Sequence, residues 1–240
     1  MSSLLNQALA EKDYLVLDGG LATTLELDGH TLDKEMWSAY TAATTPLSVV
    51  SVHERFFAAG SDIVITSSYQ MSYEGFGRKG LCMNPADPND PANKYLRAST
   101  AYAMAAKHDL SPTRRKNSFV AASVGCYGAH LGDGSEYTGT YGVSRREIEE
   151  WHDKKLGVQI NSGADLMAFE TIPCLDECKA LCSLISRYDP VKRVNGWMSF
   201  ACMSDGRLNS GENLEDALRA VLDPPADISC KRCEQSMYEL

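Results

Sequence analysis

Five short apolar runs, each followed by a helical pattern, constrain the fold of this chain more than any other feature of its sequence. The runs occupy residues 14–17 (YLVL), 62–66 (DIVIT), 119–124 (FVAASV), 166–169 (LMAF) and 197–200 (WMSF). Strands that alternate with helices imply a parallel sheet covered by helices. The pattern therefore predicts an α/β fold, either an open doubly wound sheet or a (β/α)8 barrel. No G-x-G-x-x-G follows the first run, which disfavours the dinucleotide-binding form of the doubly wound sheet.

Local signals mark the ends of several predicted helices. Thr45 and Pro46 suit an N-cap and a first helical residue, and Gly60 suits the end of the same helix. Ser144 and Glu147 have the spacing of a capping box, which predicts a helix from there to about residue 162. Apolar spacing predicts further helices around 95–106, 175–186 and 214–222. With the five runs, these helices make about five strand–helix units.

The composition narrows the class of partner and the compartment. The 240 residues carry a net charge of −9, which argues against nucleic acid or an anionic membrane as the partner. No apolar stretch is long enough to cross a membrane, and the first residues lack the basic end and apolar core of a signal peptide. Eight cysteines in such a chain indicate reduced thiols, so we expect a cytoplasmic protein.

Unusual polar residues follow several of the predicted strands. Asp18, Gly19 and Gly20 come directly after the first run, Thr66 ends the second, and Glu170 follows the fourth. In a barrel, active-site residues gather at the C-terminal ends of the strands. A carboxylate there can hold an amine, although an Asp that caps a turn is an equally good interpretation of Asp18 alone. Glu170 follows four apolar residues, and its burial would require a cation such as an ammonium group.

A segment rich in glycine and tyrosine follows the third predicted strand. Residues 125–129 (GCYGA) lead into residues 132–142 (GDGSEYTGTYG). Such a composition is poor at building a core and suited to enclosing a ligand. It is not a phosphate-binding loop, because the Gly-Lys-Ser/Thr ending is absent.

Five motifs in register resemble the homocysteine S-methyltransferase family. They are LDGGLATTLE (17–26), MWSA (36–39), AGSDIVITSSYQ (59–70), SVGCYGAHLGDGSEYTGTYG (123–142) and FETIP (169–173), and the resemblance runs from residue 14 to about 222. It implies a (β/α)8 TIM-type barrel, here incomplete with about five strand–helix units. It also implies transfer of a methyl group from S-methylmethionine or S-adenosylmethionine to the thiol of homocysteine, which gives methionine. The sequence does not show which of the two donors is used.

The resemblance also implies roles for individual residues. Asp18 and Glu170 are expected to hold the amine of homocysteine, and Gly19 and Gly20 to shape the floor of the pocket. Further pocket-lining residues are Trp37, Thr66 and Tyr69, of which Tyr69 is a plausible neighbour for a sulfonium cation. For Trp37, a core aromatic is the competing interpretation. Cys126 stands where the family usually has proline, and we expect this small residue to fit the turn.

The zinc ion that the family uses is not accounted for by this sequence. The resemblance implies three cysteine thiolates, one in a G-[IV]-N-C motif and two in a G-G-C-C motif, and neither motif occurs. No metal ligand is therefore assigned. Cys230 and Cys233 form a C-x-x-C pair, with Cys202 as a conceivable third ligand, but a pair supplies only two ligands. Cys174, Cys178 and Cys182 are spaced along one helical face, where core packing is the favoured interpretation.

Three possible functions and one domain plan follow as expectations. The chain is taken as one homocysteine-binding domain, residues 1–240, with barrel units over 14–222 and a divergent, substitute ending over 223–240. The first function is homocysteine S-methylation, with small-molecule substrates and neither nucleic acid nor membrane as partner. The alternative is a truncated, zinc-lacking and catalytically inactive homologue that binds an amino acid or a full-length relative. An unrelated small-molecule-binding barrel is a third possibility.

Overall fold

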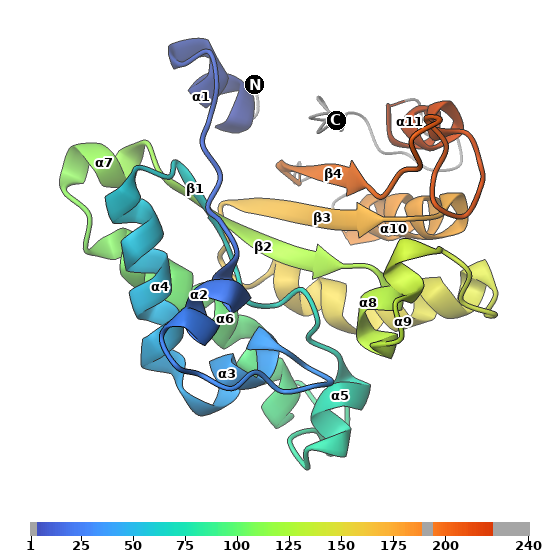
Figure 1. Cartoon of the computed structure of the whole chain (residues 1–240), viewed down its shortest axis with the longest axis horizontal. Helices are drawn as coiled ribbons and strands as arrows, with labels where there is room; N and C mark the ends of the chain where they lie inside the picture. Colours follow the sequence, from blue (N-terminus) through green and yellow to red (C-terminus); the bar gives the residue numbers. More distant parts are fainter. Residues whose placement is uncertain (1–3, 189–193, 223–240) are drawn as a thin grey trace.

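A computed structural model describes residues 4–188 and 194–222 of the chain, and its centre is a parallel sheet of four strands (Figure 1). The strands are β1 (Ile63–Ile65), β2 (Phe119–Gly125), β3 (Leu166–Ile172) and β4 (Gly196–Phe200), and they lie in the order β1-β2-β3-β4. A doubly wound sheet reverses its strand order at a switch point, and this sheet does not. The α/β prediction and its barrel-type strand order are therefore confirmed within the described residues.

The first predicted strand, residues 14–17, is reduced to a single bridge. Leu17 pairs in parallel with Ile63, and Asp18 N–H donates to the carbonyl of Ile63 at 3.0 Å. The segment thus lies beside β1, where the first strand of the pattern belongs. The ladder does not extend further because the N–H of Val16 donates to the Asp62 carboxylate at 3.0 Å and not to a backbone carbonyl. The prediction of a regular strand here was wrong, although its place beside β1 was right.

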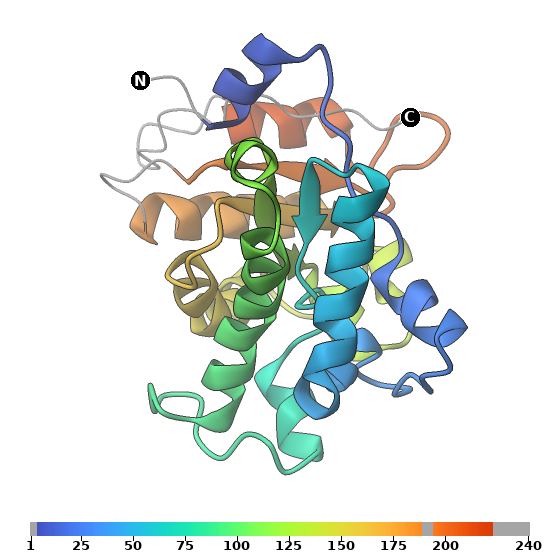
Figure 2. The same cartoon turned by 90° about the vertical axis from the view of Figure 1, so that its left-hand side faces the viewer.

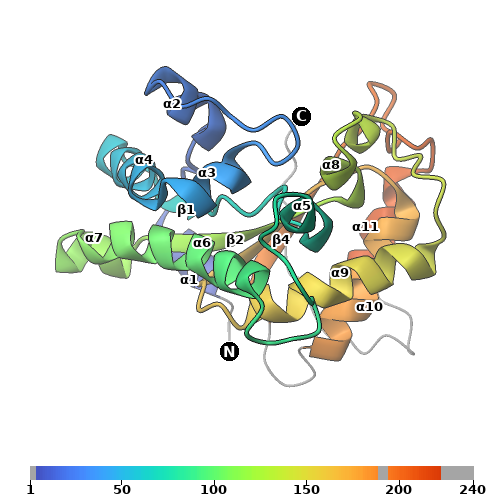
Figure 3. The same cartoon turned by 90° about the horizontal axis from the view of Figure 1, so that it is seen from below.

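Helices flank the sheet in the order of the chain (Figures 2 and 3). Helix α4 (Pro46–Ala59) lies beside α6 (Pro91–His108) in Figure 2, and α9 (Arg145–Ile160) lies beside α10 (Leu175–Tyr188) in Figure 3. Several short helices fall in segments that carried no helical prediction, because a helix of one or two turns has no apolar period to recognise. The helices are α1 (Leu4–Glu11), α2 (Leu21–Leu27), α3 (Ser38–Thr44), α4 (Pro46–Ala59), α5 (Tyr73–Arg78), α6 (Pro91–His108), α7 (Pro112–Lys116), α8 (Tyr127–Leu131), α9 (Arg145–Ile160), α10 (Leu175–Tyr188), α11 (Leu214–Leu222) and the short 3-10 helix η1 (Ser135–Tyr137).

The two faces of the sheet carry different side chains. Because side chains alternate along a strand, β2 turns Val120, Ala122 and Val124 toward the flanking helices. The opposite, inner face begins with an apolar cluster at the N-terminal ends of the strands, which also contacts α1. This inner cluster consists of Ile63, Phe119, Ala121, Leu166, Ala168 and Trp197. The inner face is therefore apolar at the N-terminal ends of the strands. Polar residues follow this cluster toward the C-terminal ends.

The helix-end signals of the sequence are largely realised. Ser144 and Glu147 form both hydrogen bonds of the capping box at the start of α9. Gly60 ends α4 in the left-handed conformation, with φ of 112°. Thr45 occupies the N-cap position of α4, but its hydroxyl donates to the carbonyl of Thr41 at 3.3 Å and does not cap the helix.

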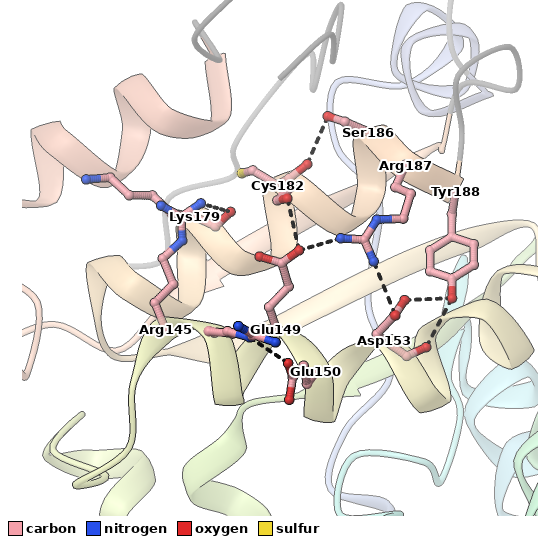
Figure 4. Close-up of polar contacts among 11 residues, drawn as sticks. Arg145, Glu149, Glu150, Asp153, Lys179, Cys182, Ser186, Arg187 and Tyr188 are labelled. Carbon is pink, nitrogen blue, oxygen red and sulfur yellow. Dashed lines mark hydrogen bonds and ion pairs between the residues drawn. The ribbon is translucent and has the colours of Figure 1, made fainter. Parts of the chain in front are cut away.

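Polar side chains join α9 to α10 (Figure 4). Arg187 donates to Glu149 at 2.6 Å and to Asp153 at 3.2 Å, and the hydroxyl of Tyr188 donates to the Asp153 carboxylate at 2.7 Å. Arg187 is 53% exposed, so each of its ion pairs contributes only about 0.2–1 kcal/mol. On α10 (Leu175–Tyr188), Cys178 and Cys182 are buried in the core as predicted.

His53 makes the fold sensitive to acid. It is fully buried on α4, and neither ring nitrogen has a hydrogen-bond partner among the described residues. Burial lowers the pKa of His53 from 6.5 to about 4. Its stabilising contribution is therefore complete above pH 6.5 and is lost as the pH falls toward 4.

We predict that His53→Leu removes part of this acid sensitivity. Between pH 6.5 and pH 5, the free energy of unfolding of the wild type should fall by about 2 kcal/mol more than that of the variant. Urea unfolding at both pH values measures the difference, with the exposed His108→Gln as the control. Equal pH dependence of wild type and His53→Leu would contradict the assignment.

Candidate functional site

A cavity of about 630 Å³ lies at the C-terminal ends of the strands. This size is within the range of about 300–1,000 Å³ that small-molecule sites occupy. Its wall contains all seven residues that the sequence singled out, namely Asp18, Gly19, Gly20, Trp37, Thr66, Tyr69 and Glu170. These residues come from four separate segments of the chain, and the fold brings them together.

Asp18 enters the cavity wall directly after the bridge between Leu17 and β1. Its carboxylate accepts a hydrogen bond from the N–H of Ile65 at 2.8 Å. Burial raises the pKa of Asp18 from 3.8 to about 7, and the negative charge of Glu170 adds to this rise. The Ile65 N–H opposes the rise because it stabilises the ionised form. Asp18 is therefore a carboxyl group that changes its charge near neutral pH.

Glu170 reaches the cavity because of the alternation along β3. Leu166 and Ala168 belong to the inner apolar cluster, so Glu170, two residues later, lies on the same face. Its carboxylate accepts a hydrogen bond from the hydroxyl of Ser123 on β2 at 2.5 Å. Ser123 follows Phe119 and Ala121 on the inner face of the neighbouring strand. The inner face thus changes from apolar to polar along both strands at the level of the cavity.

A hydrogen-bond network fixes the position of Ser123. The hydroxyl of Thr66 accepts from the Ser123 N–H at 3.0 Å, and the carbonyl of Ser123 accepts from Ser68 at 2.7 Å and from the Gln159 amide at 2.6 Å. Thr66 is buried and lies 2.8 Å from the Ser68 hydroxyl. Thr66 therefore lines the cavity and also supports Ser123, the residue that holds the carboxylate of Glu170.

Aromatic rings form part of the cavity wall. Trp37 is 46% exposed, so the interpretation as a core aromatic is wrong. Its backbone has a positive φ of 46°, a strained conformation for a residue with a side chain. Tyr69 lies deeper, with its hydroxyl 4.0 Å from the Cys126 sulfur, and burial raises its pKa. Cys126 itself is fully buried at the N-cap of α8, so the small residue fits the turn as expected.

Other cavity residues were not singled out from the sequence. Glu136 and Tyr137 come from η1 in the glycine-rich segment, and Ser123 comes from the middle of a run that was interpreted only as a strand. One carboxylate oxygen of Glu136 is buried with no hydrogen-bond partner among the described residues. The alternation of FVAASV and the charged Glu136 in GDGSEY are the signals from which these residues could have been found.

The ionisable side chains in the described lining of the cavity are all acidic. Its described lining contains three carboxyl groups, those of Asp18, Glu136 and Glu170, and no Lys, Arg or His. Because isolated buried charges are costly, such a wall favours a ligand that carries positive charge. Aromatic faces beside carboxylates add to the attraction for a cation.

The described residues do not fit a zinc site. Within 4–188 and 194–222, no three His, Cys, Asp or Glu side chains are grouped so that they could hold a metal ion. Cys202 is exposed, and Cys174, Cys178 and Cys182 are buried in the core. Cys230 and Cys233 lie outside the described residues.

A second, smaller cavity of about 270 Å³ lies between α1 and the start of β2. It is at the opposite, N-terminal end of the strands and contains none of the predicted site residues.

In the described ranges, no helix is both long and apolar enough to span a bilayer.

Comparisons with known proteins agree on one family. The family model for homocysteine S-methyltransferase matches residues 15–237. Homocysteine S-methyltransferase YbgG of Bacillus subtilis is 36% identical over 207 residues, which cover 84% of this chain and 63% of that protein. Homocysteine S-methyltransferase 1 of Zea mays is 37% identical, with 86% of this chain and 64% of that protein covered. Selenocysteine Se-methyltransferase of Brassica oleracea is 35% identical, with 85% and 60% covered.

Solved structures give the same result. The metallated form of the homocysteine methyltransferase MmuM of Escherichia coli matches with a TM-score of 0.83 and 33% identity, over 92% of this chain and 74% of that one. Its oxidized form matches with a TM-score of 0.80 and 35% identity. The present chain spans about 63% of the length of the curated relatives that it matches.

We predict that Asp18→Asn stabilises the protein at high pH and not at low pH. A folded-state pKa of about 7 against 3.8 means that the contribution of Asp18 is most favourable below pH 3.8 and is lost as the pH rises through 7. The variant should melt on the order of 5 °C above the wild type at pH 8 and within about 1 °C of it at pH 4. Scanning calorimetry measures both values, with the exposed Asp28→Asn as the control. A difference that does not change with pH would contradict the assignment.

Proposed function

This chain belongs to the homocysteine S-methyltransferase family, and we propose that it binds homocysteine in the cavity and takes part in methylation of the homocysteine thiol. The donor would be S-methylmethionine or S-adenosylmethionine, and the product methionine. The observation that carries the proposal is the meeting of Asp18 and Glu170 in a cavity whose described lining has no basic side chain. The domain limits and the cytoplasmic location expected from the sequence remain predictions.

The amine of homocysteine would bind between the two carboxylates. An ammonium group has three N–H donors, so it can donate to Asp18 and Glu170 at the same time. The Ile65 N–H orients the carboxylate of Asp18, and the Ser123 hydroxyl orients that of Glu170. A bound cation would also restore the ionised form of Asp18, which burial and Glu170 disfavour.

The methyl donor would share the same negative cavity. A sulfonium is already activated, so the protein mainly has to place its methyl group in line with the homocysteine sulfur. The homocysteine thiol loses its proton to solvent, and its sulfur forms a bond with the methyl carbon. The bond from the methyl carbon to the sulfonium sulfur breaks, and its electron pair stays on the departing neutral thioether. The rings of Trp37 and Tyr69 and the partner-free oxygen of Glu136 are the groups suited to the positive sulfur.

Binding without methyl transfer is the second candidate. It corresponds to an inactive homologue that holds an amino acid or associates with a full-length relative. Methionine formation from homocysteine with each of the two donors, followed by mass spectrometry, separates the candidates. Methionine above the uncatalysed level supports methyl transfer, and homocysteine binding with no methionine supports the second candidate.

We predict that Asp18→Asn and Glu170→Gln each weaken homocysteine binding by about 10–100-fold, because each removes one charge-assisted hydrogen bond. Both substitutions keep the shape of the side chain and an acceptor for its present donor. Titration calorimetry with L-homocysteine measures the loss. The matched ligand is 4-mercaptobutanoic acid, which lacks the amine and should bind both variants and the wild type equally weakly. Unchanged homocysteine affinity in both variants would contradict the proposal.

Homocysteine binding should also depend on pH. Because the pKa of Asp18 is about 7, its ionised fraction rises about tenfold between pH 6 and pH 8. The affinity for homocysteine should rise by a similar factor over this interval and level off above it. Asp18→Asn should flatten the profile, measured by the same titration. A profile with the same slope in wild type and variant would exclude Asp18 as the titrating group.

A further inference from the structure

The glycine-rich segment forms a compact loop whose two ends lie together. This cavity loop, residues 127–141, supplies Gly132, Gly134, Glu136 and Tyr137 to the cavity wall. At Gly128 an added Cβ would lie 2.4 Å from the backbone nitrogen of Glu136 and 2.8 Å from the Tyr141 ring. Only a glycine allows so close an approach. The start of the loop therefore packs against its own later half.

A single buried carboxylate contacts both ends of this loop. Glu177 on α10 has no exposed surface. One of its oxygens accepts from the backbone N–H of Tyr127 at 2.5 Å, and the other accepts from the hydroxyl of Tyr141 at 2.6 Å. Tyr127 and Tyr141 are the first and last residues of the cavity loop. We propose that Glu177 is the positioning residue that holds this loop in the place where Glu136 and Tyr137 reach the cavity.

The surroundings of Glu177 support a fixed arrangement. His152 on α9 is fully buried, and its Nε2 donates to the same Glu177 oxygen that receives the Tyr127 N–H, at 2.7 Å. Glu177 thus accepts hydrogen bonds from three donors in the described part of the chain, and they offset the cost of burying its charge. The later half of the loop also packs closely against the segment before α10. A Cβ added at Gly139 would lie 2.8 Å from the carbonyl oxygen of Pro173.

A buried lysine balances the charge beside this cluster. Lys155 is 1% exposed, its ammonium lies 3.8 Å from the centre of the Trp151 ring, and it donates to the carbonyl of Gly125 at 3.5 Å. Burial lowers the pKa of Lys155 to about 8, and the negative charge of Glu177 limits this decrease. Gly125 is the last residue of β2, so Lys155 fixes the chain just before the cavity loop begins.

A role in core packing alone does not account for this geometry. Apolar side chains of similar volume often stabilise a core as well as or better than a buried ionic cluster. Hydrogen bonds are directional, and two of the three to Glu177 come from the ends of one loop. Glu177 does not line the cavity, so its effect on a ligand passes through the loop.

The first test measures hydrogen exchange of the full chain without ligand. Tyr141→Phe removes the bond to one loop end and keeps the ring, and it should raise the exchange rates of the backbone amides of residues 127–141 by about 10-fold or more. Tyr188→Phe is the matched control, because it removes a tyrosine–carboxylate bond between α10 and α9 that does not involve the loop. Its loop amides should exchange as in the wild type. Unchanged loop exchange in Tyr141→Phe, or an equal increase over the whole chain, would overturn the proposal.

The second test rests on the proposed function. Tyr141→Phe should weaken the binding of L-homocysteine several-fold, and Tyr188→Phe should leave it unchanged. Saturating homocysteine should slow the exchange of the cavity loop in the variant toward the wild-type rate. Equal homocysteine affinities in the two variants, when loop exchange differs, would overturn the link between loop and ligand. If homocysteine does not bind the wild type, the proposed function fails, and the exchange without ligand still decides the role of Glu177.

Discussion

The hydrogen-bond ladder between β2 and β3 is the constraint on which the candidate site depends. Its parallel register places Ser123 opposite Ala168 and Gly125 opposite Glu170, so the Ser123 hydroxyl meets the Glu170 carboxylate. The same alternation puts Phe119, Ala121, Leu166 and Ala168 on the inner face below them. One register therefore builds an apolar base and a polar rim on the same face. The bridge between Leu17 and Ile63 adds Asp18 to that rim.

The electrostatics of the site follow from this placement. Burial is the main cause of the raised pKa of Asp18. Two carboxyl groups that share a low-dielectric space also oppose each other's ionisation, and this conflict with Glu170 adds to the rise. Such an arrangement costs stability and is retained where it serves a ligand. A cationic amino group resolves the conflict. Trp37, which directly precedes α3, and Glu136 and Tyr137 of η1 extend the same attraction across the cavity. Glu177, which lies behind the cavity wall, is also a buried carboxylate, and donors of the protein itself stabilise its charge.

Particular residues show how far the sequence could predict this structure. The alternation of apolar runs and helical patterns predicted β1 to β4 to within a few residues, and the motifs selected seven residues that share one cavity. Residues 14–17 failed as a regular strand because the Asp62 side chain takes the Val16 N–H, a tertiary contact that no local pattern reveals. Ser123 was hidden in an apolar run, and Trp37 could be placed at the rim only once its exposure was known. The contacts of Glu177 with Tyr127 and Tyr141 depend on how α10 packs against the loop, so they lay beyond sequence reasoning.

A crystal structure of the chain with bound L-homocysteine is the sharpest test of the proposed amine site. We expect the ammonium nitrogen to lie within about 3.2 Å of a carboxylate oxygen of both Asp18 and Glu170, at the C-terminal ends of the strands. Homocysteine bound with its amine away from both carboxylates would contradict it. So would homocysteine seated in the smaller cavity between α1 and β2.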